Sequence, residues 1–127
     1  MKKPTIKIFI DGGTHMSRIC LVDKYADKNI VKTRGGNPTT NELEYLALLY
    51  SLKYIHNNYK RCDVIICSDS MLVVNQINGK WRVTTPTLKP LWEKCIKLFN
   101  DNIKIKWVSR DINEAGWILE KLLKSKI

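Results

Sequence analysis

The chain has 127 residues, about the length of one globular domain, and its 22 basic and 12 acidic residues give a formal net charge of +10. We expect a single domain over residues 1–127. The charge excludes an acidic solvating tail and favours a polyanionic partner such as nucleic acid. No apolar run approaches the roughly 18 residues of a membrane-spanning helix, so no membrane association is predicted.

Three strands are predicted in the first third of the chain. Residues Thr5–Ile10 alternate apolar and other side chains with the period of two that marks a strand, and residues 11–13, Asp-Gly-Gly, read as the turn that ends it. Ser17–Lys24 and Lys28–Thr33 are short, polar-interrupted strands, which favours an antiparallel meander with one solvated face. The breaker at residues 35–40 ends this region.

Helices then alternate with two more strands. The predicted elements are a helix from Asn41 to about Asn57 with Thr40 or Asn41 as its N-cap, a strand at Asp63–Cys67, a helix from Ser68–Ser70 to Asn78, a helix near Leu88–Phe99, a strand at Ile103–Val108 and a helix from Asn113 to Lys124. This order predicts an α/β fold with a mixed sheet flanked by helices. Right-handed crossovers set the fourth strand parallel to the first.

Cysteine usage fits an intracellular domain. Cys20, Cys62, Cys67 and Cys95 form no CxxC pair and lie on or beside apolar stretches. They therefore predict buried, reduced thiols in a cytoplasmic protein, not a zinc site or a disulfide framework. No feature of the sequence indicates an obligatory protein partner.

Three acids occupy positions where an unpaired charge is costly. Asp11 follows an apolar strand, Asp69 follows a second one, and Glu44 is the only charge between Leu43 and Leu52. Taken singly, they could be an Asx-turn residue, a helix N-cap and a charge on a narrow exposed stripe. The predicted topology brings all three toward one sheet edge, where clustered carboxylates repel unless a cation binds. Oxygen ligands alone select a hard ion, Mg²⁺ or Mn²⁺.

The segments that carry these acids resemble the three principal motifs of type 1 ribonuclease H in order and spacing. They are Ile8–Gly13, Thr39–Tyr45 and Cys67–Ser70, and the similarity continues through Val74–Trp81 and Trp107–Arg110. The resemblance implies a ribonuclease H-like fold with a five-stranded mixed sheet, in which three antiparallel strands precede parallel ones. It also implies hydrolysis of the RNA strand of RNA–DNA hybrids, giving 5′-phosphate and 3′-hydroxyl ends.

The same resemblance implies roles for individual residues. Asp11, Glu44 and Asp69 are expected to hold two divalent ions, Mg²⁺ or Mn²⁺. One ion would activate the attacking water and the other would stabilise the leaving 3′ oxygen. The residues implied to bind the hybrid are Gly12, Gly13, Thr39, Thr40, Asn41, Met71, Lys80 and Trp81.

One departure from the family pattern concerns the start of the last helix. The family has a fourth carboxylate there, in an Asn-x-x-Ala-Asp pattern, whereas Asn113–Trp117 is one residue shorter, with Gly116 in the place of the aspartate. Glu120 lies one turn further on the same side, and helical side chains lean toward the N-terminus, so Glu120 is a candidate fourth catalytic and metal-binding carboxylate. Alternatively, it pairs with Lys124 at the surface.

Two further alternatives remain open for the fourth acid. Either Glu114 or Asp111 supplies it, or no fourth protein ligand exists. In the last case the chain could be a catalytically weakened or inactive domain that binds hybrid or double-stranded RNA. The loop before the last helix also lacks the family's product-release histidine, whose role is vacant or passes to Arg110, Asp111 or Glu114.

Overall fold

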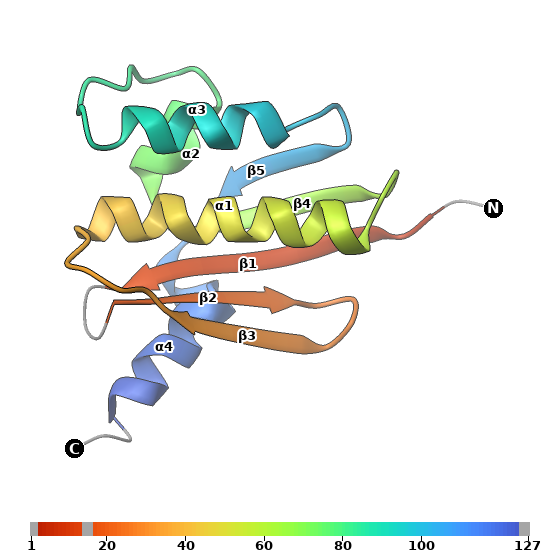
Figure 1. Cartoon of the computed structure of the whole chain (residues 1–127). Coiled ribbons are helices and arrows are strands. Elements are labelled where there is room, and N and C mark those ends of the chain that lie inside the picture. Colours follow the sequence, from red (N-terminus) through yellow and green to blue (C-terminus); the bar gives the residue numbers. More distant parts are fainter. Residues whose placement is uncertain (1–2, 14–16, 125–127) are drawn as a thin grey trace.

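The structure is a computed structural model that describes residues 3–13 and 17–124. Its five strands form one mixed sheet in the order β3-β2-β1-β4-β5 (Figure 1). The elements are β1 (Thr5–Gly13), β2 (Arg18–Asp23), β3 (Lys28–Thr33), α1 (Thr40–Asn58), β4 (Asp63–Ser68), α2 (Met71–Ile77), α3 (Lys89–Leu98), β5 (Ile103–Trp107), a 3-10 turn (Arg110–Ile112) and α4 (Glu114–Lys124). β1 pairs antiparallel with β2 and parallel with β4, so the predicted fold class is confirmed.

Helices cover both faces of the sheet. α1 and α3 lie on one face, and α4 crosses β1 and β2 on the other (Figure 1). The alternation of β1 divides its side chains between the two layers, because Ile8 and Ile10 join the core under α1 while Phe9 joins the smaller core under α4. Asp11 has the same parity as Phe9 and therefore belongs to the face of the sheet that α4 covers.

The first strand is longer than predicted. β1 continues through Gly13, with Asp11, Gly12 and Gly13 paired to residues of β2, so these three residues do not form a turn. The sequence resembles a turn because glycine is common in turns, but glycine also occurs within strands where another backbone approaches closely. Asp11 thus projects from a hydrogen-bonded strand and not from a loop.

The N-cap of α1 also differs from the prediction. Thr39, not Thr40 or Asn41, caps the helix: its hydroxyl accepts from the Glu42 amide at 3.2 Å, and the Glu42 carboxylate accepts from the Thr39 amide at 3.1 Å. This reciprocal capping box requires an acid three residues after the cap, and Glu42 has that place for Thr39. Thr40 has Leu43 there, and Glu44, three residues after Asn41, accepts instead from the Gly12 amide.

All four cysteines are free thiols, as predicted. Cys20, Cys67 and Cys95 are buried and Cys62 is half-buried. Within the described residues, no helix combines the length and apolar character that crossing a membrane requires.

Candidate active site

The three acids singled out in the sequence lie together at one edge of the sheet. Asp11 comes from β1, Glu44 from the second turn of α1, and Asp69 from the segment between β4 and α2. Each carboxylate places an oxygen within 4.8 Å of an oxygen of the other two. The parallel pairing of β1 with β4 brings Asp11 and Asp69 to the same end of the sheet, and the packing of α1 on β1 adds Glu44.

Gly12 determines how closely α1 approaches β1. A Cβ atom at this position would lie 2.6 Å from the main-chain carbon and oxygen of Leu43, a distance at which the backbone would have to shift. The close approach lets the Gly12 amide donate a 2.6 Å hydrogen bond to Oε1 of Glu44. The glycine is therefore required for this contact between strand and helix, independently of any contact with a substrate.

Burial and mutual repulsion raise the pKa of two of the three carboxylates, those of Asp11 and Glu44. Burial, and then the charge of Asp69, raises the pKa of Asp11 to about 6, while the Arg110 guanidinium acts in the opposite direction. Glu44 is only 8% exposed, and burial followed by the charge of Asp11 raises its pKa to about 9. Glu44 therefore keeps its proton at neutral pH when no cation is present.

The donor set fits a divalent cation. The three side chains offer carboxylate oxygens only, the hard ligands that Mg²⁺ and Mn²⁺ prefer over softer metals. A cation among them would remove the repulsion that raises the pKa of Asp11 and Glu44.

The acids line a cavity of about 440 Å³. Its lining also includes two basic residues, Arg18 and Arg110, and three large side chains of α4, Trp117, Leu119 and Leu123. Guanidinium groups beside a carboxylate cluster suit an anionic ligand such as a phosphodiester, which needs both cations and hydrogen-bond donors.

Gly116, the position at which the family resemblance implies a fourth carboxylate, lies against the acid cluster. A Cβ atom built there would lie 3.3 Å from Oδ2 of Asp11 and 3.8 Å from Oδ2 of Asp69, so a side chain at this position would enter the acid cluster. Glu120 lines the same cavity but is not part of the three-acid cluster. Its Oε1 lies 3.9 Å from Nζ of Lys124, and its side chain is 66% exposed.

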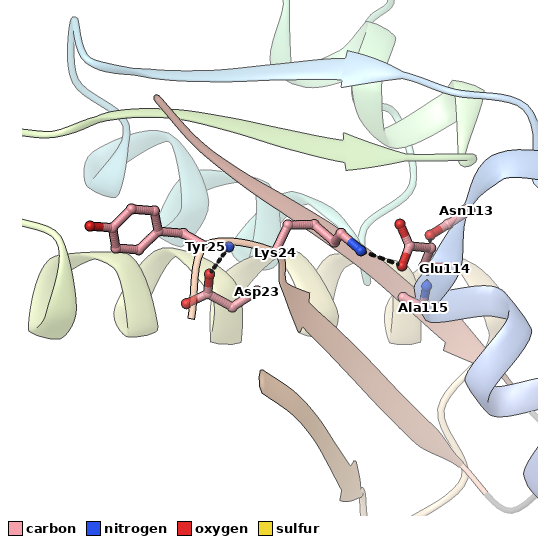
Figure 2. Close-up of polar contacts among 6 residues, drawn as sticks. All are labelled: Asp23, Lys24, Tyr25, Asn113, Glu114 and Ala115. Atoms are coloured by element: carbon pink, nitrogen blue, oxygen red, sulfur yellow. Dashed lines mark hydrogen bonds and ion pairs between the residues drawn. The ribbon is translucent and has the colours of Figure 1, made fainter. Parts of the chain in front are cut away.

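The other two candidates for a fourth acid do not line the cavity. Glu114 forms an ion pair with Lys24, with 2.9 Å between Oε1 and Nζ (Figure 2). Asp111 lies in the exposed 3-10 turn that precedes α4.

The residues implied to bind a hybrid occupy four segments, of which the end of β1 and the start of α1 line the cavity. At the start of α1, the Thr39 hydroxyl is engaged in the capping box, Asn41 is exposed, and Thr40 lines the cavity. Met71 begins α2 and is 50% exposed, and Trp81, beside the exposed Lys80 in the loop after α2, is 47% exposed. Gly12 is buried, and Gly13 is half-buried at the cavity.

Sequence reasoning missed several residues that line the cavity or contact the acids. Arg18 faces Gly13 across the β1–β2 pairing, so the correct hairpin register would have placed it beside the acids. Asn113 was noted only as part of a motif, yet its side chain donates to Asp69 at 3.0 Å. Trp117 is half-exposed at the cavity, and nothing in the local pattern distinguishes it from an ordinary surface residue.

The similarities of this chain to known proteins agree with this geometry. The profile of a family described as reverse transcriptase-like matches residues 20–119. A curated relative, Ribonuclease H of Desulforamulus reducens, is 35% identical over a region that covers 55% of this chain and 50% of that protein. The chain thus matches about half the length of this relative.

Solved structures extend the similarity to nearly the whole chain. RNase H1 from the halophilic archaeon Halobacterium salinarum has a TM-score of 0.80 at 24% identity, covering 96% of this chain and 99% of that chain. LC11-RNase H1, solved in complex with an RNA/DNA hybrid, has a TM-score of 0.79 at 24% identity, covering 93% and 99%. This chain belongs to the reverse transcriptase-like family and has the fold of a type 1 ribonuclease H.

Proposed function

We propose that this protein is a metal-dependent endoribonuclease that hydrolyses the RNA strand of RNA–DNA hybrids. The observation that carries the proposal is the cluster of Asp11, Glu44 and Asp69, whose oxygens lie within 4.8 Å of one another. Its setting supports the same conclusion, because the chain carries a net charge of +10 and can hold a polyanion around an acidic site. A structure of similar fold, LC11-RNase H1, was solved with an RNA/DNA hybrid.

In this proposal the three acids hold two divalent ions, Mg²⁺ or Mn²⁺. Such ions lower the pKa of water and neutralise the charge that develops on a phosphodiester. The task of the chain is to hold the carboxylates in place, with Asp11 between Glu44 and Asp69. Hydrolysis would leave a 5′-phosphate and a 3′-hydroxyl.

The hybrid would be held by the segments around the cavity. Arg18 and Arg110 are placed to contact phosphate oxygens near the acids. Met71 would touch the minor groove, where the 2′-hydroxyl distinguishes RNA from DNA, and Trp81 with Lys80 would pack on the sugar-phosphate backbone of the DNA strand. The remaining proposed contacts are those of Gly12, Gly13, Thr39, Thr40 and Asn41.

Glu120 is the proposed fourth carboxylate. It lines the cavity on the same side of α4 as Gly116, and its contact with Lys124 is a solvent-exposed pair that contributes little to stability. Glu120→Gln should reduce cleavage by orders of magnitude, whereas Glu93→Gln, an exposed change on α3, should not. Equal cleavage rates for both variants would mean that Glu120 is an ordinary surface residue and not a metal ligand.

Gly116 favours a second candidate function, a domain that binds hybrid or double-stranded RNA with little or no turnover. A site that has lost one carboxylate holds divalent ions less tightly, and retained basic residues would still bind the nucleic acid. Against it stand the three remaining acids, which are costly to keep together without a cation.

One assay separates the two functions. A 5′-labelled RNA is incubated alone, annealed to DNA, or annealed to RNA, with Mg²⁺, Mn²⁺ or EDTA, and Asp69→Asn controls for contaminating nucleases. Internal, metal-dependent cuts in the hybrid that the variant lacks are expected. Tight hybrid binding without cuts under either metal would favour the binding domain.

A further inference from the structure

The residue that precedes α4 is joined to the acid cluster by its side chain. Asn113 is fully buried, with 0% of its surface exposed. Its Nδ2 donates two hydrogen bonds, each 3.0 Å long, to the carbonyl oxygen of Ile10 and to Oδ2 of Asp69. Its Oδ1 accepts from the Ala115 amide at 3.2 Å. Both donors of the amide group are therefore used, as is its acceptor oxygen.

These contacts join β1, which carries Asp11, to Asp69, the residue that follows β4. The Ile10 carbonyl immediately precedes Asp11 on β1, while Asp69 follows β4. The Asn113 amide group thus bridges the main chain beside one acid and the carboxylate of another. Because it is anchored at three points, it can transmit the position of β1 to the Asp69 side chain.

Asp69 depends on such a partner for its orientation. The terminal torsion of an aspartate is broad and roughly two-fold, so packing alone does not fix the plane of the carboxylate. The main chain of Asp69 is held by Trp107, whose indole Nε1 donates to the Asp69 carbonyl at 3.2 Å. The hydrogen bond from Asn113 acts on the carboxylate itself and commits Oδ2 to the amide.

We infer that Asn113 is a positioning residue, which fixes the orientation of the Asp69 carboxylate toward a divalent ion. The inference rests on the proposed metal site. Partners that orient metal ligands in this way typically change metal affinity or activity about 10-fold to 100-fold when they are removed.

The same residue also helps to fix α4, and this structural role must be separated from the positioning role. Figure 2 shows a second tether at the start of the helix, the ion pair between Lys24 and Glu114, which touches no acid of the cluster. Lys24→Met breaks that tether and is the matched control for a loosened helix. Asn113→Ser keeps an oxygen able to cap the Ala115 amide but is too short to donate to Asp69, and Asn113→Ala loses both contacts.

The experiment measures Mn²⁺ binding by titration calorimetry without nucleic acid, and melting temperature in EDTA by circular dichroism. Asn113→Ser and Asn113→Ala should both bind Mn²⁺ about 10-fold more weakly than the wild type. Asn113→Ala should melt lower than Asn113→Ser, because it also loses the cap. Lys24→Met should leave Mn²⁺ affinity unchanged. With a hybrid substrate, Asn113→Ser should lower kcat with little change in KM, since the side chain is buried away from any ligand.

Two outcomes would overturn the inference, and they can be told apart. If the wild type binds Mn²⁺ and Asn113→Ser, folded in EDTA, binds it equally well, Asn113 has a structural role only, and the proposed function stands. If the wild type binds no Mn²⁺ and cuts no hybrid, the proposed function is wrong. The positioning role of Asn113 is then wrong as well, because Asp69 is not a metal ligand.

Discussion

Two sites in this protein, Asp23 and the acid cluster, take carboxylates out of water. The cost of burying the carboxylates is offset in a different way at each site. Asp23, at the far end of β2, is fully buried. Its Oδ1 accepts from the amides of Tyr25 (Figure 2) and Ala26, at 3.0 and 3.1 Å, and its Oδ2 accepts from the hydroxyls of Tyr54 and Tyr59. The protein itself therefore supplies four donors to one carboxylate.

The acid cluster at the other end of the sheet receives far less. Its three carboxylates share the Gly12 amide, which interacts with both Glu44 and Asp11, and Nδ2 of Asn113, which donates to Asp69. Glu44 and Asp11 also hydrogen-bond each other. The difference teaches how to separate a structural acid from a functional one. A buried carboxylate with a complete set of donors needs no further partner, whereas crowded acids with few donors need a cation from solution.

The largest expected effect on stability comes from removing the satisfied acid. Asp23→Ala leaves the hydroxyls of Tyr54 and Tyr59 without their acceptor, and we expect the free energy of unfolding to fall by about 3 kcal/mol. Urea unfolding measures this change. Mn²⁺ affinity should stay at the wild-type value, and a parallel loss of affinity in the folded variant would mean that the two ends of the sheet are not independent.

Adding a divalent ion should stabilise the protein through the acid cluster and not through Asp23. At a concentration 100 times its Kd, Mg²⁺ or Mn²⁺ should raise the free energy of unfolding by about 2.7 kcal/mol. Calorimetric melting with EDTA and with the metal ion measures this gain in stability. The Asp23→Ala variant should show the same gain. In Asp69→Asn the gain should largely vanish. A wild-type melting temperature that does not respond to either ion would contradict a shared metal site.

The pH dependence of stability in the metal-free protein should reflect the raised pKa of Glu44. Because the pKa of Glu44 is raised to about 9, the folded protein holds a proton that the unfolded chain has already released. Stability in EDTA should therefore fall as pH rises from the ordinary glutamate range toward 9, by at most about 1.4 kcal/mol per pH unit for this proton.

Glu44→Gln is the variant that checks this slope. It keeps an oxygen for the Gly12 amide but cannot ionise, so its unfolding free energy should depend less on pH than that of the wild type. Urea titrations at pH 6, 7, 8 and 9 compare the two proteins. Parallel curves would show that Glu44 does not control the dependence.

The smallest expected effect concerns Gly116. A Cβ atom 3.3 Å from Oδ2 of Asp11 forces one of the two groups to move by a few tenths of an ångström. In Gly116→Ala this crowding opposes the gain of about 1 kcal/mol that alanine brings to a helix, so stability should change by less than about 1 kcal/mol. Mn²⁺ affinity, measured by calorimetry, should fall. Gly35→Ala, where the added atom meets only open space, should leave it unchanged.

Much of the fold followed from local patterns. The apolar strands and the helix around Glu44 were recognisable because burial leaves short runs of β-branched or mixed apolar residues, and the right-handed crossover rule then set β4 beside β1. The convergence of the three acids depended on that topology and on the absence of a basic partner near Glu44. The apolar patterns and the missing basic partner can be read in single segments, and the topology follows from the order of the segments.

The remaining features depend on contacts between distant segments. The continuation of β1 through Gly13 depends on pairing with β2, and the burial of Asp23 depends on tyrosines that lie 31 and 36 residues further along the chain. Asn113 meets Ile10 across 103 residues. No periodicity marks such contacts, because each is fixed only when the sheet and its helices have packed.

The contact between Gly12 and Glu44 has a consequence for folding kinetics. Glu44 joins the cluster only after α1 has docked closely on β1, and Asp69 joins only after β4 has paired beside that strand. We therefore expect the three acids to come together late in folding, when α1, β1 and β4 have packed. Divalent ions should then prolong the lifetime of the folded protein by slowing its unfolding, and leave the rate of folding nearly unchanged.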